Sequence, residues 1–419
     1  MKHEMSHDSI ESSVIKKQKL DASQPPVKNA KSEKESDPDS TVVRGAKRKA
    51  VAMLMSFYGK DFFGMQVTRE KNFPGIEDIF CKYLVDGGLI RQDDYDCFGK
   101  MNFQRSCRTD KHVSAARLVI SFKMYELDNA VEIINSFLPK SVRVHDYVRT
   151  TKGFDCKKWA SSRIYNYVVP SYCFQHKSAV NKQALQLFRV DETLKKRINE
   201  VLNHYHGTKN FHNFTSRKEG KDPSAIRYIT SFKITDTFLW PDKCEDESVE
   251  QTEYLTLSVH GQSFMLHQIR KMIGLAMAVV RGNTEEIIYE KIFGNDKHDI
   301  PKAPSIGLYL ENVFFEYYNK KFGTDGMHTP VKWDHCEDAV ENFKREQIVC
   351  NILNDMRKEK VFEEYLPILD LHTYTTEIGH RLTRPDHVPN VTEVKTELDK
   401  VENDSVVLEN ETEKIVNNS

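Results

Sequence analysis

The sequence predicts an α+β protein in which two similar mixed halves, about residues 50–170 and 180–318, share one central, largely antiparallel sheet. Two observations predict it: expected strands outnumber expected helices and come in neighbouring runs, and the same mixture of strand and helix patterns appears twice. The length of 419 residues also exceeds what one compact core usually holds, which favours two or more units.

The first half begins with an apolar strand at Ala50–Tyr58 that stops at Gly59. Pro74 and Gly75 then open an amphipathic helix whose apolar residues recur at helical spacing. The other elements expected here are a strand at Ala115–Phe122, a helix at Ala130–Phe137 closed by Pro139, and strands at Val142–Val148 and Arg163–Val169.

The second half repeats this mixture. Its expected elements are a helix at Asp191–Tyr205, strands at Ile226–Thr235 and Tyr254–Val259, a helix at Met265–Arg281 ended by Gly282, and a closing strand at Leu308–Phe315. Residues 337–369 are predicted to form a long charged helix pair that is broken at Pro367, because proline lacks the backbone N–H that a helix interior requires.

The predicted domain boundaries follow from these patterns: 50–170 and 171–330 for the two halves, and 331–384 for a helical extension. Residues 1–49 and 385–419 contain no aromatic residue and are rich in charge, so both are expected to be disordered tails. The first tail holds two basic clusters, Lys16–Lys19 and Lys47–Lys49, which fit either nuclear import or simple solubility.

Composition excludes some classes of function and leaves others open. The net charge of -1 gives no overall basic excess, so a nucleic-acid surface would have to arise from local clustering. The 8 cysteines form no CxxC pair, which indicates free thiols rather than a zinc ribbon or disulfide framework. No apolar run approaches the roughly 18 residues of a membrane span, and no secretory signal or nucleotide-cofactor motif is visible.

The most unusual segment is CRTDKHVSA, Cys107–Ala115, where Arg108, Asp110 and Lys111 directly precede an apolar strand. Such a cluster is commonly a local ion pair or turn cap. It can also hold an ionised carboxylate that acts as a nucleophile, a base or a metal ligand, because nearby positive charge favours the charged form. A metal would need more ligands than His112 alone. Spacing does not decide further between these readings.

This segment resembles the GRTDxGVHA signature of the TruA family of tRNA pseudouridine synthases, and most closely its eukaryotic nuclear and mitochondrial branch, which has RTDKGVSA. Five further segments resemble family motifs in the same order. They are SFYGKDFFGMQ (Ser56–Gln66), SSRIYNYVVP (Ser161–Pro170), GTKNFHNFTSRK (Gly207–Lys218), FMLHQIRKMIG (Phe264–Gly274) and APSIGLYL (Ala303–Leu310). Together the resemblance covers about two-thirds of the chain and implies the pseudouridine synthase fold.

The resemblance implies a cofactor-free isomerase, with no metal, that converts uridine to pseudouridine within folded tRNA. Asp110 matches the essential aspartate, which acts as a nucleophile or as a base. Tyr165 matches the tyrosine that packs on the target base and helps to remove its C5 proton, and Arg270 matches the arginine that pairs with the aspartate. The nucleotide must leave its stack, which costs a few kcal/mol and requires a pocket with stacking groups.

The resemblance also assigns residues to substrate binding. Arg108 is expected to intercalate at the flipped-out site or hold a phosphate, and Phe264 and Leu308 to line the uracil pocket. Arg163 belongs to a set of basic residues expected to face RNA, and His212 lies in the GTKNFHNFTSRK segment. Two residues depart from the family pattern: Met65 replaces tryptophan and His112 replaces glycine, so His112 would be mildly strained if the backbone there has a positive φ.

Two other functions remain as alternatives: an RNA-binding protein or tRNA chaperone that keeps the fold without turnover, and a hydrolase acting on a sugar bond. A hydrolase would normally pair two carboxylates, and no second acid accompanies the motif. Messenger and small nuclear RNA are open as further substrates, a monomer and a homodimer fit equally, and the expected location is the nucleus, with a mitochondrial share left open. No membrane association is expected.

Overall fold

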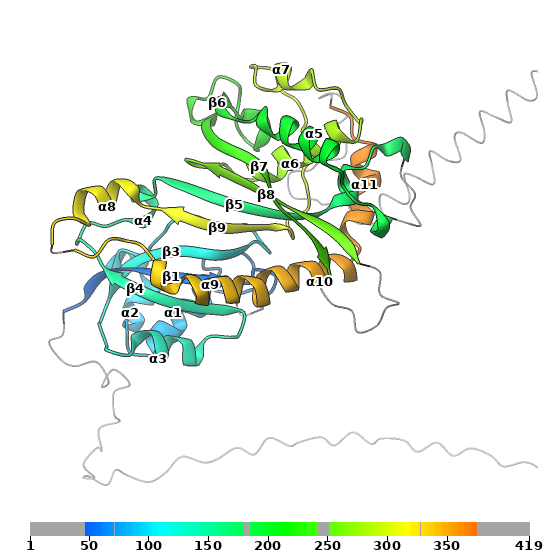
Figure 1. Ribbon diagram of the computed structural model, residues 1–419. Helices are drawn as coiled ribbons and strands as arrows, with labels where there is room; N and C mark the ends of the chain where they lie inside the picture. Colours follow the sequence, from blue (N-terminus) through cyan, green and yellow to red (C-terminus); the bar gives the residue numbers. More distant parts are fainter. Residues whose placement is uncertain (1–46, 71, 180–184, 242–250, 327, 375–419) are drawn as a thin grey trace, which may run out of the picture. The chain divides into compact units, whose positions relative to one another are not determined.

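The computed structural model describes residues 47–70, 72–179, 185–241, 251–326 and 328–374 (Figure 1). The predicted disorder of residues 1–46 and 385–419 falls outside these ranges. The last residues of the predicted N-terminal tail belong to the fold, since Lys49 begins strand β1 and Arg48 pairs with Asp94. Arg48 and Lys49 are therefore part of the fold and not of a tail.

Nine strands of the described chain form one sheet. They are β1 (Lys49–Phe57), β2 (Gln104–Arg105), β3 (Ser114–Met124), β4 (Val142–Arg149), β5 (Ser162–Pro170), β6 (Gly207–Asn210), β7 (Ile226–Trp240), β8 (Thr252–Gly261) and β9 (Leu308–Phe314). Every strand that the sequence predicts is present, and β7 is longer than expected. The short strands β2 and β6 were not predicted.

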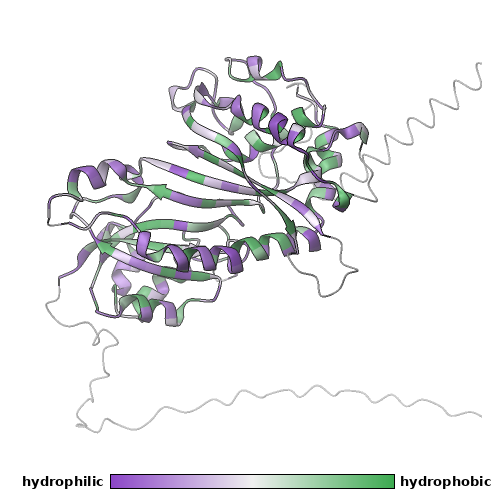
Figure 2. Ribbon diagram, viewed as in Figure 1, coloured by the Kyte–Doolittle hydropathy of each residue, from purple (hydrophilic) through white to green (hydrophobic). Residues whose placement is uncertain are grey.

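The α-helices of the described residues are α1 (Ile76–Asp86), α2 (Gln92–Asp96), α3 (Ala130–Phe137), α4 (Cys156–Trp159), α5 (Glu192–Asn203), α6 (Gln268–Val280), α7 (Ile288–Ile292), α8 (Glu316–Phe322), α9 (Glu337–Phe343), α10 (Cys350–Lys358) and α11 (Val361–Asp370). The amphipathic pattern located the longer ones correctly. In α5, for example, Ile198, Val201 and Leu202 are buried, and the charged remainder is hydrophilic in Figure 2.

The strand order is β4-β1-β3-β9-β5-β8-β7-β6, with β2 added beside β3 (Figure 1). Among the described strands β3 and β9 run parallel, and all other neighbours are antiparallel. This confirms the largely antiparallel sheet shared by both halves. Strand β5, grouped with the first half by sequence, pairs with β9 on one side and β8 on the other. The sheet is therefore continuous across residue 170.

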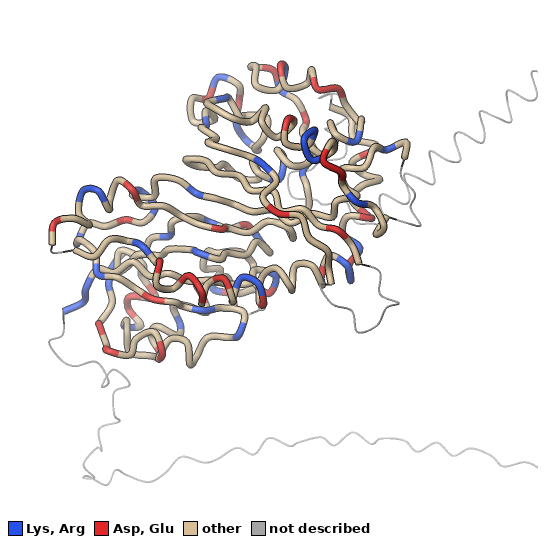
Figure 3. Tube along the Cα trace, viewed as in Figure 1, with Lys and Arg blue, Asp and Glu red and all other residues tan. Residues whose placement is uncertain are grey.

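Strand β3 contacts helix α1 of the first half and helix α9 of the C-terminal extension. Phe80 of α1 lies edge-on to Phe122 of β3, with ring centroids 6.2 Å apart. Arg117 of β3 instead forms ion pairs with Glu337 and Glu341 of α9. The C-terminal extension is thus attached to the central sheet partly by charge, and the acidic residues of α9 are visible in Figure 3.

The C-terminal extension differs from the prediction in where its helices break. A π-helical segment, Lys344–Val349, joins α9 to α10 without interruption. The break falls at Glu359 and Lys360, where Lys360 adopts φ 49°. Pro367 lies inside α11. The prediction of a break at Pro367 is wrong, because one missing backbone donor is tolerated in this short helix and the left-handed residue reverses the chain earlier.

No helix in the described part of the chain is long and apolar enough to cross a membrane. The seven cysteines described are free thiols, in agreement with the reading of the cysteine pattern.

Candidate active site

The loop that carries Asp110 connects β2 to β3 and is held by the segment after β1. The backbone N–H of Met65 donates to the carbonyl of Thr109 at 3.3 Å, and the N–H of Val113 donates to the carbonyl of Asp110 at 3.1 Å. Gly64 has φ +90° and passes so close that an added Cβ would lie 3.3 Å from the Thr109 carbonyl oxygen. The glycine of the SFYGKDFFGMQ motif therefore permits the close approach that shapes the loop.

Strand β9 brings the Asp110 loop and Tyr165 to the same level of the sheet. Leu310 of β9 is the register partner of Ala115 on one side and of Tyr165 on the other. Because neighbouring strands are about 4.8 Å apart, the two backbones lie on the order of 10 Å apart. Ala115 follows Asp110 by only five residues. The parallel pair of β3 and β9 is thus the feature that assembles the site.

Asp110 is partly buried, with 28% of its side chain exposed. Burial raises the pKa of Asp110 above its ordinary value of 3.8, and the positive charges of Arg270 and then Lys302 offset part of this rise. A residue that sequence reasoning missed, His267, places Nε2 3.9 Å from Asp110 Oδ2. Burial lowers the pKa of His267 to about 4, so the imidazole is neutral at neutral pH and this contact is not an ion pair.

His267 precedes α6 with φ 62°, and nothing in its local sequence predicts this geometry. One feature of the sequence could have pointed to His267. It precedes Arg270 by three residues, which is close to one helical turn, so the two side chains can lie on the same side at the start of α6.

Arg270 reaches the site but does not pair with Asp110 as predicted. Its Nε donates to the carbonyl of Ala303 at 2.7 Å. Within the described chain, no nitrogen of Arg270 lies within 4.0 Å of a carboxylate oxygen. The predicted ion pair is therefore corrected to a charge interaction through space, because the Ala303 carbonyl takes up one edge of the guanidinium. Burial lowers the pKa of Arg270, and the nearby Tyr167 and Asp110 act in the opposite direction.

Tyr165 and Phe264 form the aromatic part of the site. Their rings are edge-to-face with centroids 5.4 Å apart. Burial raises the pKa of Tyr165 well above its ordinary range, and the neighbouring Cys107 thiol raises it further. Burial in turn raises the pKa of Cys107 to about 11. The phenol is therefore neutral in the protein without RNA.

Three other predicted residues lie at or near this site. Arg108 is exposed, and it has no hydrogen-bond or ion-pair partner among the described residues. Leu308 is 6% exposed and begins β9 opposite Tyr167 of β5. The guanidinium of Arg163 donates hydrogen bonds to two backbone carbonyls: NH2 lies 2.8 Å from the oxygen of Ser106, and NH1 lies 2.8 Å from that of Gln262. Arg163 thus ties the Asp110 loop to the segment before α6.

His212 is placed differently from the prediction. Its side chain is fully buried, and its Nε2 lies 3.1 Å from the carbonyl oxygen of Asp296. A buried ring cannot contact RNA directly, so the expectation of a substrate contact is corrected. The segment instead supports α6 from beneath, since Lys271 Nζ donates to the carbonyl of Asn213 at 3.1 Å. Burial lowers the pKa of Lys271 to about 8.

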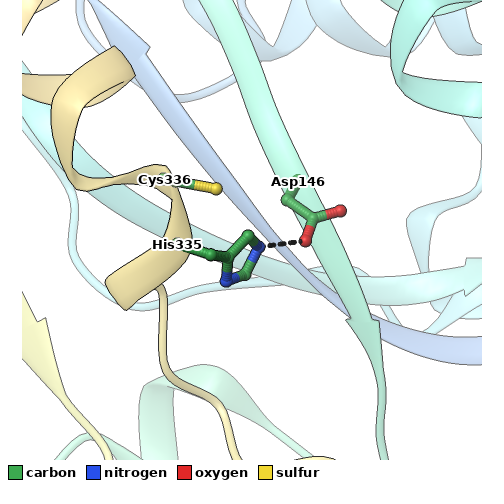
Figure 4. A group of neighbouring side chains, drawn as sticks. All are labelled: Asp146, His335 and Cys336. Atoms are coloured by element: carbon green, nitrogen blue, oxygen red, sulfur yellow. Dashed lines mark hydrogen bonds and ion pairs between the residues drawn. The ribbon is translucent and has the colours of Figure 1, made fainter.

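One group of described residues has metal-ligating atoms close together: Asp146, His335 and Cys336 (Figure 4). His335 Nε2 lies 2.7 Å from Asp146 Oδ2, so a hydrogen bond between them already accounts for this arrangement. The group joins β4 to the C-terminal extension, and none of its members belongs to the segments around Asp110. It is therefore a structural contact separate from the candidate active site.

The pKa of Asp110 leads to a prediction about pH. A nucleophile or base must be ionised, and the raised pKa means that ionisation is completed at a higher pH than for an exposed aspartate. Single-turnover rates of the wild type should therefore rise with pH through a limb that lies above 3.8. The Lys82→Met variant, changed at an exposed pair on α1, provides the control and should show the same limb. A rate already at its maximum near pH 4 would contradict the burial of this carboxylate.

The chain is similar in sequence to known proteins of one family. The family model described as tRNA pseudouridine synthase matches residues 201–316. The chain is 40% identical over 327 residues to the human protein named pseudouridylate synthase 1 homolog, which covers 78% of this chain and 74% of the relative. The chain belongs to the tRNA pseudouridine synthase family.

Two other relatives also have names that describe pseudouridine synthases. The mouse pseudouridylate synthase 1 homolog is 38% identical over 352 residues, covering 84% of this chain and 79% of the relative. The Saccharomyces cerevisiae tRNA pseudouridine synthase 1 is 30% identical over 398 residues, covering 77% and 71%. The matches to these relatives span most of the chain, whereas the family model covers only the segment that contains α6 and β9.

Proposed function

We propose that this protein is a tRNA pseudouridine synthase, an isomerase that converts specific uridines of folded tRNA to pseudouridine. The observation that carries the proposal is the arrangement around β9, where a partly buried carboxylate, a buried tyrosine and a nearby arginine meet. The arrangement occurs in a chain that belongs to the family and whose fungal relatives are named tRNA pseudouridine synthase 1.

In the proposed reaction the bond from C1′ to N1 is broken, the uracil turns, and C5 is joined to C1′. Asp110 is the reacting group, either as a nucleophile or as a base, and both roles require its ionised form. Arg270 and Lys302 stabilise that form by their charge. The partial burial of Asp110 supports this role, because a desolvated carboxylate is both more basic and more reactive than one in water.

Tyr165 and Phe264 are proposed to receive the flipped uracil. A flipped base is held by stacking on aromatic and apolar side chains, and these two rings contact each other edge to face. Leu308 lies two residues along β9 from Leu310, the register partner of Tyr165. Burial keeps the phenol of Tyr165 neutral, which favours packing over proton removal as its role in the free protein.

Arg108 is proposed to bind the RNA backbone beside the flipped nucleotide. The neighbouring Lys111 places Nζ 3.9 Å over the ring of Phe63, whereas Arg108 is exposed and unengaged within the described chain. Arg108→Met should therefore weaken tRNA binding roughly tenfold and lower the slope of log affinity against log salt by about one. Filter binding at several salt concentrations checks this, with Lys100→Met as a control at an exposed pair. An unchanged slope in Arg108→Met would remove this contact from the proposal.

The substrate range and location are further parts of the proposal. We propose that messenger and small nuclear RNAs that present a tRNA-like fold are also modified, since folded RNA is recognised by its shape and phosphates. We propose a nuclear location, with a mitochondrial share, and either a monomer or a homodimer. Since Arg48 of the second basic cluster is paired with Asp94, Lys16–Lys19 is the better import signal. Imaging of the tagged chain with and without these lysines would decide the location.

The experiment that tests the function is mapping of pseudouridine in unmodified tRNA transcripts before and after incubation with the protein. New pseudouridine at defined positions is expected, while tight binding without any modification would instead favour an RNA chaperone that keeps the fold.

A further inference from the structure

The segment between β1 and α1 contacts the Asp110 loop on one side and the C-terminal helix α10 on the other. Lys60 lies at the centre of this segment. Its Nζ is 2.7 Å from Asp355 Oδ1 and 2.6 Å from Glu359 Oε1, both at the end of α10. The hydroxyl of Tyr58 also donates to Asp355. Residues almost 300 positions apart in the sequence are thereby joined.

The backbone carbonyl of Lys60 contacts the catalytic loop directly. His112 Nδ1 lies 2.8 Å from this oxygen. A carbonyl can only accept, so Nδ1 carries the hydrogen and donates it. His112 stands two residues after Asp110, and its backbone has φ 65°. This confirms that the glycine position of the family pattern has a positive φ here, and a side chain in that conformation is mildly strained.

Packing around this contact leaves little freedom. Gly59 passes Val113 so closely that an added Cβ would lie 2.3 Å from the Val113 carbonyl oxygen. The N–H of Gly59 donates to Ser114 Oγ at 2.9 Å. The chain on both sides of His112 is therefore fixed against the Tyr58–Lys60 segment, and any shift of Lys60 must be passed to the loop.

We propose that His112 and Lys60 are positioning residues for Asp110, and that Asp355 of α10 and Glu359, which follows this helix, hold Lys60 in place for this purpose. The C-terminal extension thus contributes to the rate of the reaction. This inference rests on the proposed function, because it concerns the orientation of the proposed reacting carboxylate.

The physical basis is the sensitivity of catalysis to small displacements. A shift of about 1 Å in a reacting group can cost about 100-fold in rate. The hydrogen bond from His112 compensates for its left-handed backbone, whereas glycine adopts that backbone without strain but donates nothing. A histidine at this position therefore costs some backbone strain, and its hydrogen bond to the Lys60 carbonyl fixes the loop in return.

The test is a set of variants at position 112 measured by steady-state kinetics over a range of tRNA concentrations, which gives kcat and KM separately. His112→Ala keeps the strain and loses the bond, so kcat should fall roughly 10- to 100-fold, with KM for tRNA unchanged. His112→Gly also loses the hydrogen bond but relieves the backbone strain, so its kcat should fall less than that of His112→Ala. His112→Asn, which tolerates a positive φ and can donate, should be close to the wild type.

A second set of variants, at position 60, tests the contribution of the contacts between Lys60 and the end of α10. Lys60→Met should lower kcat by a similar factor, and Lys60→Arg, which can still reach both carboxylates, should restore most of it. The losses in His112→Ala and Lys60→Met should not add in the double variant, because both act through one carbonyl. The matched control is His335→Ala, which removes another contact between the extension and the sheet through Asp146 and should keep the wild-type kcat.

The outcomes separate this inference from the proposed function. A wild-type protein that makes no pseudouridine contradicts the function itself. With an active wild type, an unchanged kcat in His112→Ala, or a loss confined to KM, overturns the positioning role. Equal losses in His335→Ala would show a general effect of the extension and also overturn it. If His112→Ala does not fold, the comparison of Lys60→Met with Lys60→Arg decides the question alone.

Discussion

Replacing Asp110 with asparagine or alanine is expected to abolish pseudouridine formation while leaving the fold and tRNA affinity near those of the wild type. Removal of a reacting carboxylate should lower kcat by at least about 10³-fold, since no other described residue is placed to take over its role. Nucleoside analysis of digested tRNA measures the product, and filter binding measures the affinity.

The same substitution has a consequence for stability that a purely structural aspartate would not share. Because burial raises the pKa of Asp110 in the folded protein, the folded state binds this proton more tightly than the unfolded chain. The free energy of unfolding therefore falls as pH rises through this window, and ionised Asp110 destabilises the fold at neutral pH. Asp110→Asn should be as stable as the wild type or more so in urea unfolding at pH 7. Asp93→Asn, at an exposed ion pair, is the control.

Replacing Arg117 with leucine should produce the largest loss of stability. The Arg117 side chain is 6% exposed and lies 2.6 Å from Glu311, 2.8 Å from Glu337 and 2.6 Å from Glu341. Lys344 would still pair with Glu311 and Glu341, whereas Glu337 would lose its cationic partner and the charge-assisted hydrogen bonds of Arg117 would be lost. The free energy of unfolding should therefore fall by about 2–3 kcal/mol. Urea denaturation at pH 7 measures this.

The comparison for Arg117→Leu is Lys195→Met, which breaks an exposed pair with Glu192 in α5. Exposed pairs contribute about 0–1 kcal/mol, so this control should unfold almost as the wild type does. Equal stabilities of the two variants would contradict the view that the buried Arg117 guanidinium helps to attach α9 to β3.

Much of the fold could be predicted from the sequence because it is encoded locally. The apolar run of Ala50–Tyr58 and the helical spacing after Gly75 reflect burial of neighbouring residues, and both appear as β1 and α1. The insertion of β9 between β3 and β5 was not predictable in this way. It pairs Leu310 with residues far away in the chain, and no local pattern specifies such a partner.

The same distinction applies to the candidate site. Asp110, Tyr165 and Arg270 were predicted as site residues through motif resemblance, and the structure brings their segments together. His267 and the Lys60–His112 contact were missed, because both depend on backbone conformations with positive φ and on contacts across the fold. His212 was assigned to substrate binding because it lies in a segment that resembles a family motif, yet its side chain is buried.

The most direct test of the central claim follows the hydrogen on C5 of uridine. That hydrogen must leave when C5 becomes bonded to C1′, so tRNA carrying tritium at C5 of its uridines should release it to water as pseudouridine forms. The wild-type protein is expected to release one tritium for each pseudouridine made, and Asp110→Asn none. Absence of release by the wild type from any tRNA, or equal release by Asp110→Asn, would contradict the account.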